Sequence, residues 1–119
     1  MVQGYDFTGN LVVSNKITVV ADGKTFKGGL YACEGSTLNV ATSVFEGNVT
    51  VEEGVKFTGL DTSEEILKPV TLLQTKGTIT SPLLDRKDPL TKNRYYVRTR
   101  GEIKELCYGR KPGTMIILR

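Results

Sequence analysis

Phe7-Thr8-Gly9-Asn10-Leu11-Val12-Val13 recurs in form as Phe26-Lys27-Gly28-Gly29-Leu30-Tyr31-Ala32 and as Phe45-Glu46-Gly47-Asn48-Val49-Thr50-Val51. The three copies begin at a constant interval (26 − 7 = 45 − 26 = 19), and a fourth Phe-x-Gly motif follows at Phe57 after a shorter one (57 − 45 = 12). These motifs contain all four phenylalanines of the chain. A fixed period near twenty with β-forming residues is typical of a solenoid in which each repeat forms one coil. The sequence therefore predicts an all-β fold, a short parallel β-helix (β-solenoid) of about three coils.

Stacked coils would place equivalent residues in columns, about 4.8 Å apart along the axis. The expected inward columns are Phe7, Phe26 and Phe45; Leu11, Leu30 and Val49; and Val13, Ala32 and Val51. The glycine two positions after each phenylalanine fits a tight corner, which needs a positive φ or the absence of a Cβ atom. We therefore assign the repeated residues to the core and not to a ligand platform.

The regular repeat is expected to end near residue 60. Asp61 and Glu64 have the spacing of a helix capping box, and Pro69 would prevent a helix from continuing. We predict one or two helical turns within residues 61–68. The whole chain, residues 1–119, is expected to form a single domain, with solenoid coils in residues 1–60 and a C-terminal capping segment in residues 61–119.

The capping segment is predicted to consist of short strands. Residues 70–74 and 78–80 form two of them, and an exposed loop with two prolines follows at residues 81–93. Residues 95–99, 102–107 and 114–118 form three more, and their hairpin-length connections indicate antiparallel pairing. Such a mixed or antiparallel cap would cover the unpaired backbone groups at the end of a solenoid.

Composition narrows the chemistry open to the chain. It has no histidine, which removes the commonest general base and a common zinc ligand. The net charge of +3 conceals an asymmetry, because residues 1–66 hold nine Asp and Glu whereas residues 67–119 hold twelve Lys and Arg. No apolar stretch is long enough for a membrane span, and residues 1–20 lack the features of a signal peptide.

Two cysteines, Cys33 and Cys107, are too far apart in sequence for a CxxC metal or redox motif. They could form a disulfide between the repeat and the cap, or remain two separate thiols. Glu52 and Glu53 are adjacent, and neighbouring residues of a strand point to opposite faces, so they are not expected to act as a catalytic pair. We therefore predict no catalytic residues, no metal ligands and no cofactor.

The strongest candidate for ligand binding is one face of the strand at residues 95–99. Arg94, Tyr96, Arg98 and Arg100 alternate along this strand and would share a face. Three guanidinium groups and an aromatic ring could hold an acidic polysaccharide or another polyanion. The competing interpretation is a cap strand whose charges protect it from edge pairing.

The chain resembles the C-terminal part of secreted parallel β-helix proteins of the autotransporter-passenger and adhesin type. The resemblance rests on the Phe-x-Gly coils, on Val70-Thr71-Leu72-Leu73-Gln74-Thr75-Lys76-Gly77-Thr78-Ile79-Thr80, and on Gly113-Thr114-Met115-Ile116-Ile117-Leu118-Arg119. It implies an extracellular or cell-surface location and a passive scaffold or adhesive surface, without catalytic residues.

Three functions are therefore considered. The first is a non-enzymatic structural or adhesive module of a larger β-solenoid protein. The second is a binding module for an acidic polysaccharide or other polyanion, and the third is a polymer-forming solenoid of the cytoskeletal type. The expected partners are the rest of a longer solenoid chain or a second copy stacked at the N-terminal coil, with an acidic glycan as a further candidate. Nucleic acid is not an expected partner.

Overall fold

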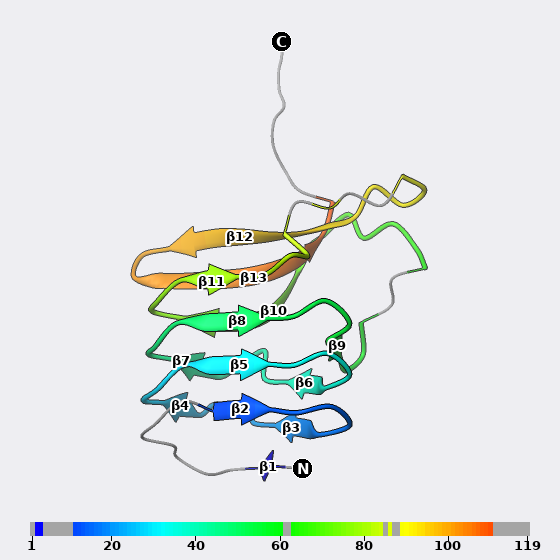
Figure 1. Cartoon of the computed structure of the whole chain (residues 1–119). Coiled ribbons are helices and arrows are strands. Elements are labelled where there is room, and N and C mark those ends of the chain that lie inside the picture. The colour runs from blue at the N-terminus through cyan, green and yellow to red at the C-terminus, as the bar shows by residue number, and fades with distance from the viewer. Residues whose placement is uncertain (1, 4–10, 61–62, 85, 87–88, 111–119) are drawn as a thin grey trace.

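A computed structural model describes residues 2–3, 11–60, 63–84, 86 and 89–110 of the chain. It confirms an all-β fold in which short strands stack along one axis as a β-solenoid (Figure 1). The described ranges contain no helix. The strands are β1 (Val2–Gln3), β2 (Leu11–Val13), β3 (Thr18–Val20), β4 (Thr25–Phe26), β5 (Leu30–Ala32), β6 (Thr37–Asn39), β7 (Val44–Phe45), β8 (Val49–Val51), β9 (Lys56–Phe57), β10 (Val70–Thr75), β11 (Ile79–Thr80), β12 (Arg94–Arg100) and β13 (Ile103–Gly109).

The strands form three sheets, which we call A, B and C. Sheet A has the order β1-β3-β6-β9, sheet B the order β11-β8-β5-β2, and sheet C the order β12-β13-β10-β7-β4. Each coil contributes one strand to each sheet in turn, as in β5, β6 and β7. Strands of successive coils pair in parallel, and their partners, such as Leu11 and Leu30, are equivalent positions of neighbouring repeats. One sequence repeat is therefore one full coil.

The predicted core columns are confirmed wherever the structure describes them. Phe26 and Phe45 stack with ring centroids 4.6 Å apart and planes 14° from parallel, and both are buried. The columns of Leu11, Leu30 and Val49 and of Val13, Ala32 and Val51 are also buried and in register. Phe7 lies outside the described residues. Above Phe45, the position in sheet C passes to Thr75, so the aromatic column ends there.

The fourth Phe-x-Gly motif belongs to a different sheet from the second and third motifs. Phe57 lies in β9 of sheet A and pairs with Leu38, which in turn pairs with Val19. These three residues are again separated by one repeat each, so the coil period continues through Phe57 and does not break off there. The shorter interval before this motif arises because Phe57 continues the sheet A column, whereas Phe26 and Phe45 belong to sheet C.

The helical turns predicted within residues 61–68 are wrong for the described part, residues 63–68, which have no helix. Residues 61–62 lie outside the described residues. The backbone of this segment is bound by tertiary partners. The N–H of Ile66 donates to Oδ1 of Asn93 at 2.9 Å, Nδ2 of Asn93 donates to the carbonyl of Glu64 at 2.8 Å, and the N–H of Arg110 donates to the carbonyl of Ile66 at 2.8 Å.

The side chain of Asn93, which is 1% exposed, holds segment 63–68 through two hydrogen bonds, and its replacement tests their contribution. Replacing Asn93 with alanine would leave two partly buried backbone groups, the N–H of Ile66 and the carbonyl of Glu64, without their partner, at a cost of about 2 kcal/mol. We expect segment 63–68 to open about thirtyfold more often, since 1.4 kcal/mol corresponds to a factor of ten. Limited proteolysis would measure this as faster cleavage within residues 63–68. Val12→Ala, at an exposed position on sheet B that does not line the groove beside this segment, is the control and should leave the cleavage rate unchanged.

After segment 63–68, which contains no strand, the chain returns to the stacked coils. Gln74 and Thr75 of β10 pair in parallel with Val44 and Phe45 of β7, and β11 pairs in parallel with β8. The third coil therefore consists of β8, β9 and β10, and β11 begins a further coil. The predicted division at residue 60 thus falls inside the third coil, although both strands predicted for residues 70–80 are present.

The predicted antiparallel cap is confirmed for its first two strands. β12 and β13 form a hairpin, and β13 lies antiparallel on β10 (Figure 1). β13 thus occupies the place in sheet C where a parallel strand of the next coil would otherwise lie. The loop at residues 81–93 touches this cap through a parallel bridge between Leu84 and Tyr95. The strand predicted at residues 114–118 lies outside the described residues.

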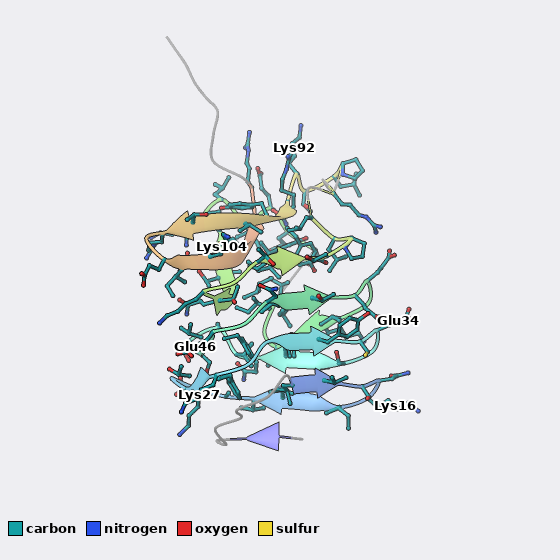
Figure 2. All side chains as sticks on the ribbon, turned by 60° about the vertical axis from the view of Figure 1, so that its left-hand side comes forward. Lys16, Lys27, Glu34, Glu46, Lys92 and Lys104 are labelled. Atoms are coloured by element: carbon teal, nitrogen blue, oxygen red, sulfur yellow. The ribbon has the colours of Figure 1, made fainter. Side chains whose placement is uncertain are left out.

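Charged side chains project from the corners between the sheets (Figure 2). Lys16 and Glu34 extend from one side of the stack, and Lys27 and Glu46 from another. At the corner between sheets B and A the backbone repeats a left-handed residue once per coil, with φ of 69° at Lys16, 85° at Gly35 and 91° at Gly54. Glycine adopts a positive φ at the least steric cost, which explains why two of these three positions, Gly35 and Gly54, are glycines.

Candidate functional site

The basic face predicted on the cap strand is only partly available to a ligand. Arg94, Tyr96, Arg98 and Arg100 do alternate along β12 and pair with alternate residues of β13. However, Tyr96 is only 4% exposed, so its ring cannot serve as the predicted stacking platform. Arg100 is exposed and Arg94 is half-buried. The single-strand pattern could not reveal that the ring of Tyr96 is covered.

Arg98 is engaged within the sheet. Its Nε and Nη2 atoms both lie 2.8 Å from Oε1 of Glu105, and Nη2 lies 3.4 Å from Oγ1 of Thr71. The Glu105 side chain is 8% exposed, and its hydrogen bond to Arg98 raises the pKa of the guanidinium. A charge-assisted, two-pronged contact of this kind positions the side chain strongly. Arg98 thus joins β12, β13 and β10, and its charge is already balanced by a carboxylate.

Cys107 lies on the same face of β13 as Glu105 and is fully buried. Burial raises the pKa of its thiol, which favours the protonated and unreactive form. Cys33 is at the corner between sheets B and A and is only partly buried. Both cysteines are free thiols in the structure. Of the two alternatives that the sequence left open, a disulfide or two separate thiols, the structure therefore has two separate thiols.

The thiols should differ sharply in reactivity. In the folded chain Cys33 is expected to react with a thiol reagent at least about a hundredfold faster than Cys107, because reaction at Cys107 requires local opening of the cap. The measurement is the time course of labelling, read by mass spectrometry at each cysteine. In Cys33→Ser the fast phase should vanish, and equal rates at the two thiols would contradict the buried position of Cys107.

A second polar cluster lies on the outer face of sheet B. Tyr31 donates its hydroxyl proton to Oε2 of Glu52 at 2.7 Å, and the backbone N–H of Glu34 donates to Oε1 of Glu52 at 2.8 Å. These bonds lower the pKa of Glu52, and the hydrogen bond to Glu52 raises the pKa of Tyr31. Glu53 instead contacts Arg86 at 2.7 Å. Both residues follow the end of β8 at Val51, so strand alternation does not decide their directions, but their carboxylates have different partners.

This cluster borders a shallow cavity of about 420 Å³, which Thr50 and Pro82 also line. Its floor combines an aromatic ring with carboxylates, but Tyr31, Glu52 and Glu53 already have partners inside the chain. The sequence pattern did not predict this cavity. The available signal was the outward position that Tyr31 and Thr50 share in successive repeats.

A more apolar groove of about 430 Å³ lies between segment 63–68 and nearby residues of sheets A and C. It was also missed, because it depends on the path of that segment. Its lining residues are Leu38, Asn39, Val40, Ala41, Phe57, Thr58, Gly59, Leu60, Glu64, Glu65, Ile66, Val70, Thr71 and Leu72.

Comparisons with known proteins place no further constraint on the site. No family model, no curated protein and no solved structure matches the chain. Among the described residues, no group of three or more His, Cys, Asp or Glu side chains could hold a metal ion. No helix long and apolar enough to cross a membrane is found in the part of the chain that the structure describes.

Proposed function

We propose that the chain is a non-enzymatic structural or adhesive module, the terminal coils and cap of a β-solenoid at a cell surface or in a secreted protein. The main support for this proposal is that β13 pairs with β10 in the antiparallel direction. A parallel strand at this position would leave an edge on which another coil could stack. In this chain the hairpin makes β12 the edge strand of sheet C instead.

The residues of β12 support a terminating role. Thr99 and Arg100 are exposed, and Arg94 and Arg98 are partly exposed. Cationic side chains on an edge strand disfavour pairing with another chain, because each added strand would bring like charges together. The buried columns below require nothing from a ligand, which fits a passive scaffold.

The test is the state of association of an altered cap. Arg94→Val/Arg100→Val removes the edge charges and leaves the Arg98–Glu105 contact in place. We expect this variant to self-associate with rising concentration, measured by sedimentation velocity. Lys27→Val/Lys76→Val, at two exposed corner positions, removes the same charge away from the edge and should remain monomeric.

A cap variant that stays monomeric would contradict the terminating role. Association of the unmodified chain through its N-terminal coil would instead favour the polymer-forming alternative, in which a second copy stacks on the solenoid.

A polyanion-binding function is the second candidate, because two arginines of the predicted set are still available. In the described ranges neither Arg94 nor Arg100 takes part in an ion pair, unlike Arg86, Arg98 and Arg110. Binding to an acidic polysaccharide such as heparin should be salt-sensitive and should be lost in Arg94→Ser/Arg100→Ser. If the unmodified chain does not bind at low salt, this candidate is rejected.

A further inference from the structure

The outer face of sheet B carries an exposed apolar column. The four strands of this sheet lie one above another on one side of the stack (Figure 1). Val12 of β2 and Tyr31 of β5 occupy paired positions on it, and they are 62% and 41% exposed. The same column continues at Thr50 of β8 and Thr80 of β11. An exposed apolar patch with a polar rim is typical of an interaction surface, whereas isolated apolar side chains are not.

The rim of this column is acidic. Glu34, Glu52 and Glu53 line the shallow cavity beside the ring of Tyr31. Glu53 is paired with Arg86, but the ion pairs found within the described ranges include neither Glu34 nor Glu52. Glu34 is exposed and extends away from the stack (Figure 2). In the described part of the chain, two carboxylates beside an exposed aromatic ring are therefore left without a cationic partner.

The hydrogen bond between Tyr31 and Glu52 fixes the ring without neutralising the carboxylate. Both donors to Glu52, the hydroxyl of Tyr31 and the backbone N–H of Glu34, are uncharged. The bond from Tyr31, followed by that from Glu34, lowers the pKa of Glu52, so this carboxylate is ionised at neutral pH. The face of an aromatic ring attracts a cation through its quadrupole. The ring and the two carboxylates therefore favour the same kind of ligand, a positively charged group.

Among cationic side chains, that of arginine matches this site best. Its guanidinium group is planar, stacks on aromatic faces and presents several donors to carboxylates, whereas the ammonium group of lysine is a compact and strongly hydrated charge. Each carboxylate oxygen of Glu52 accepts one hydrogen bond within the chain and retains a further lone pair for such a donor. The cavity of about 420 Å³ is open on the outer face of the sheet, so an arginine can enter it from another molecule.

We propose that the outer face of sheet B around Tyr31 is a docking site for an arginine of a partner protein. The guanidinium group stacks on the ring of Tyr31 and binds the carboxylates of Glu34 and Glu52, while an apolar side chain next to the arginine packs on Val12. This inference deepens the adhesive part of the proposed function and rests on it. The terminating role of β12 concerns sheet C and is tested by sedimentation, so either proposal can fail without the other.

Titration of the full chain with a short peptide, followed by amide NMR, tests the proposal. The probe is the blocked peptide Val-Arg-Gly-Arg-Val, and its matched control has citrulline, which is uncharged and similar in shape, in place of both arginines. We expect the arginine peptide to shift the amide resonances of Tyr31, Glu34 and Thr50 and to leave that of Lys27, at the corner between sheets C and B, unchanged. The citrulline peptide should bind at least about fivefold more weakly, because it lacks the charge that the ring and the carboxylates attract.

Three variants complete the test. Tyr31→Leu removes the ring and Glu52→Gln removes the charge, and each should weaken binding of the arginine peptide about fivefold. Glu46→Gln removes the same charge at an exposed corner that does not line the cavity, and it should leave binding unchanged. The absence of amide shifts around Tyr31, or equal binding of the two peptides, would overturn the proposal. So would an equal loss in Glu46→Gln, because it would reflect the total charge and not the cavity.

Discussion

Phe45→Ala is expected to lower the free energy of unfolding by about 3–5 kcal/mol, which is the usual cost of deleting a buried phenylalanine ring. Phe45 is fully buried between Phe26 and Thr75, one coil below and one coil above. Its loss removes both its own burial and the stacked contact with Phe26, which is worth about 0.5–1.5 kcal/mol beyond the buried area. No flexible side chain in the column can fill the space.

Urea unfolding followed by circular dichroism measures this effect. Val12→Ala is the control, because Val12 is 62% exposed on the outer face of sheet B and should change stability by no more than about 0.5 kcal/mol. A loss below about 1 kcal/mol for Phe45→Ala, well under the usual cost of such a deletion, would mean that the aromatic column does not hold adjacent coils together.

Gly47→Ala is the second substitution with a large expected effect, about 3 kcal/mol of destabilisation, the upper end for overpacking. A Cβ atom at Gly47 would lie 2.6 Å from the backbone nitrogen of Gly29 and 2.9 Å from the carbonyl carbon of Gly28. Both are main-chain atoms of the preceding coil, so the two coils would have to separate at this corner. The glycine predicted at this position is therefore needed for close approach of the backbone.

Gly23→Ala separates this clash from the general cost of replacing glycine. Gly23 has a φ of 67°, but a Cβ atom there would meet nothing within 4 Å. It should cost about 1 kcal/mol, from the left-handed backbone alone. Equal losses for the two variants, measured by thermal unfolding, would show that coil separation at Gly47 is easier than the geometry indicates.

The solenoid could be predicted from sequence because each coil repeats the same inward residues. Leu11, Leu30 and Val49 reveal their column directly, since a parallel stack in register places equal sequence positions next to each other. The expected columns left out Phe57, because its Phe-x-Gly motif lies in sheet A and not, like those of Phe26 and Phe45, in sheet C. Counting one repeat back from Phe57 leads to Leu38 and would have given the correct column.

The path of segment 63–68 and the exposure of the basic face of β12 could not be predicted in the same way. The capping-box spacing of Asp61 and Glu64 is a local signal, whereas the side chain that binds this segment, Asn93, lies far along the chain from its partner Ile66. Similarly, the alternation along β12 placed Tyr96 and Arg98 on one face, but their availability depends on neighbours such as Glu105. Long-range contacts of this kind leave no periodic trace in a sequence.

The in-register stacking of coils also makes the length of this molecule adjustable in discrete steps. Residues 30–48 run from one sheet B position to the residue before its equivalent in the next coil. Duplicating them would lengthen the stack by one inter-strand spacing, about 4.8 Å, while the hairpin of β12 and β13 would keep its seat on β10. The number of coils therefore sets the length of the solenoid in steps of one inter-strand spacing.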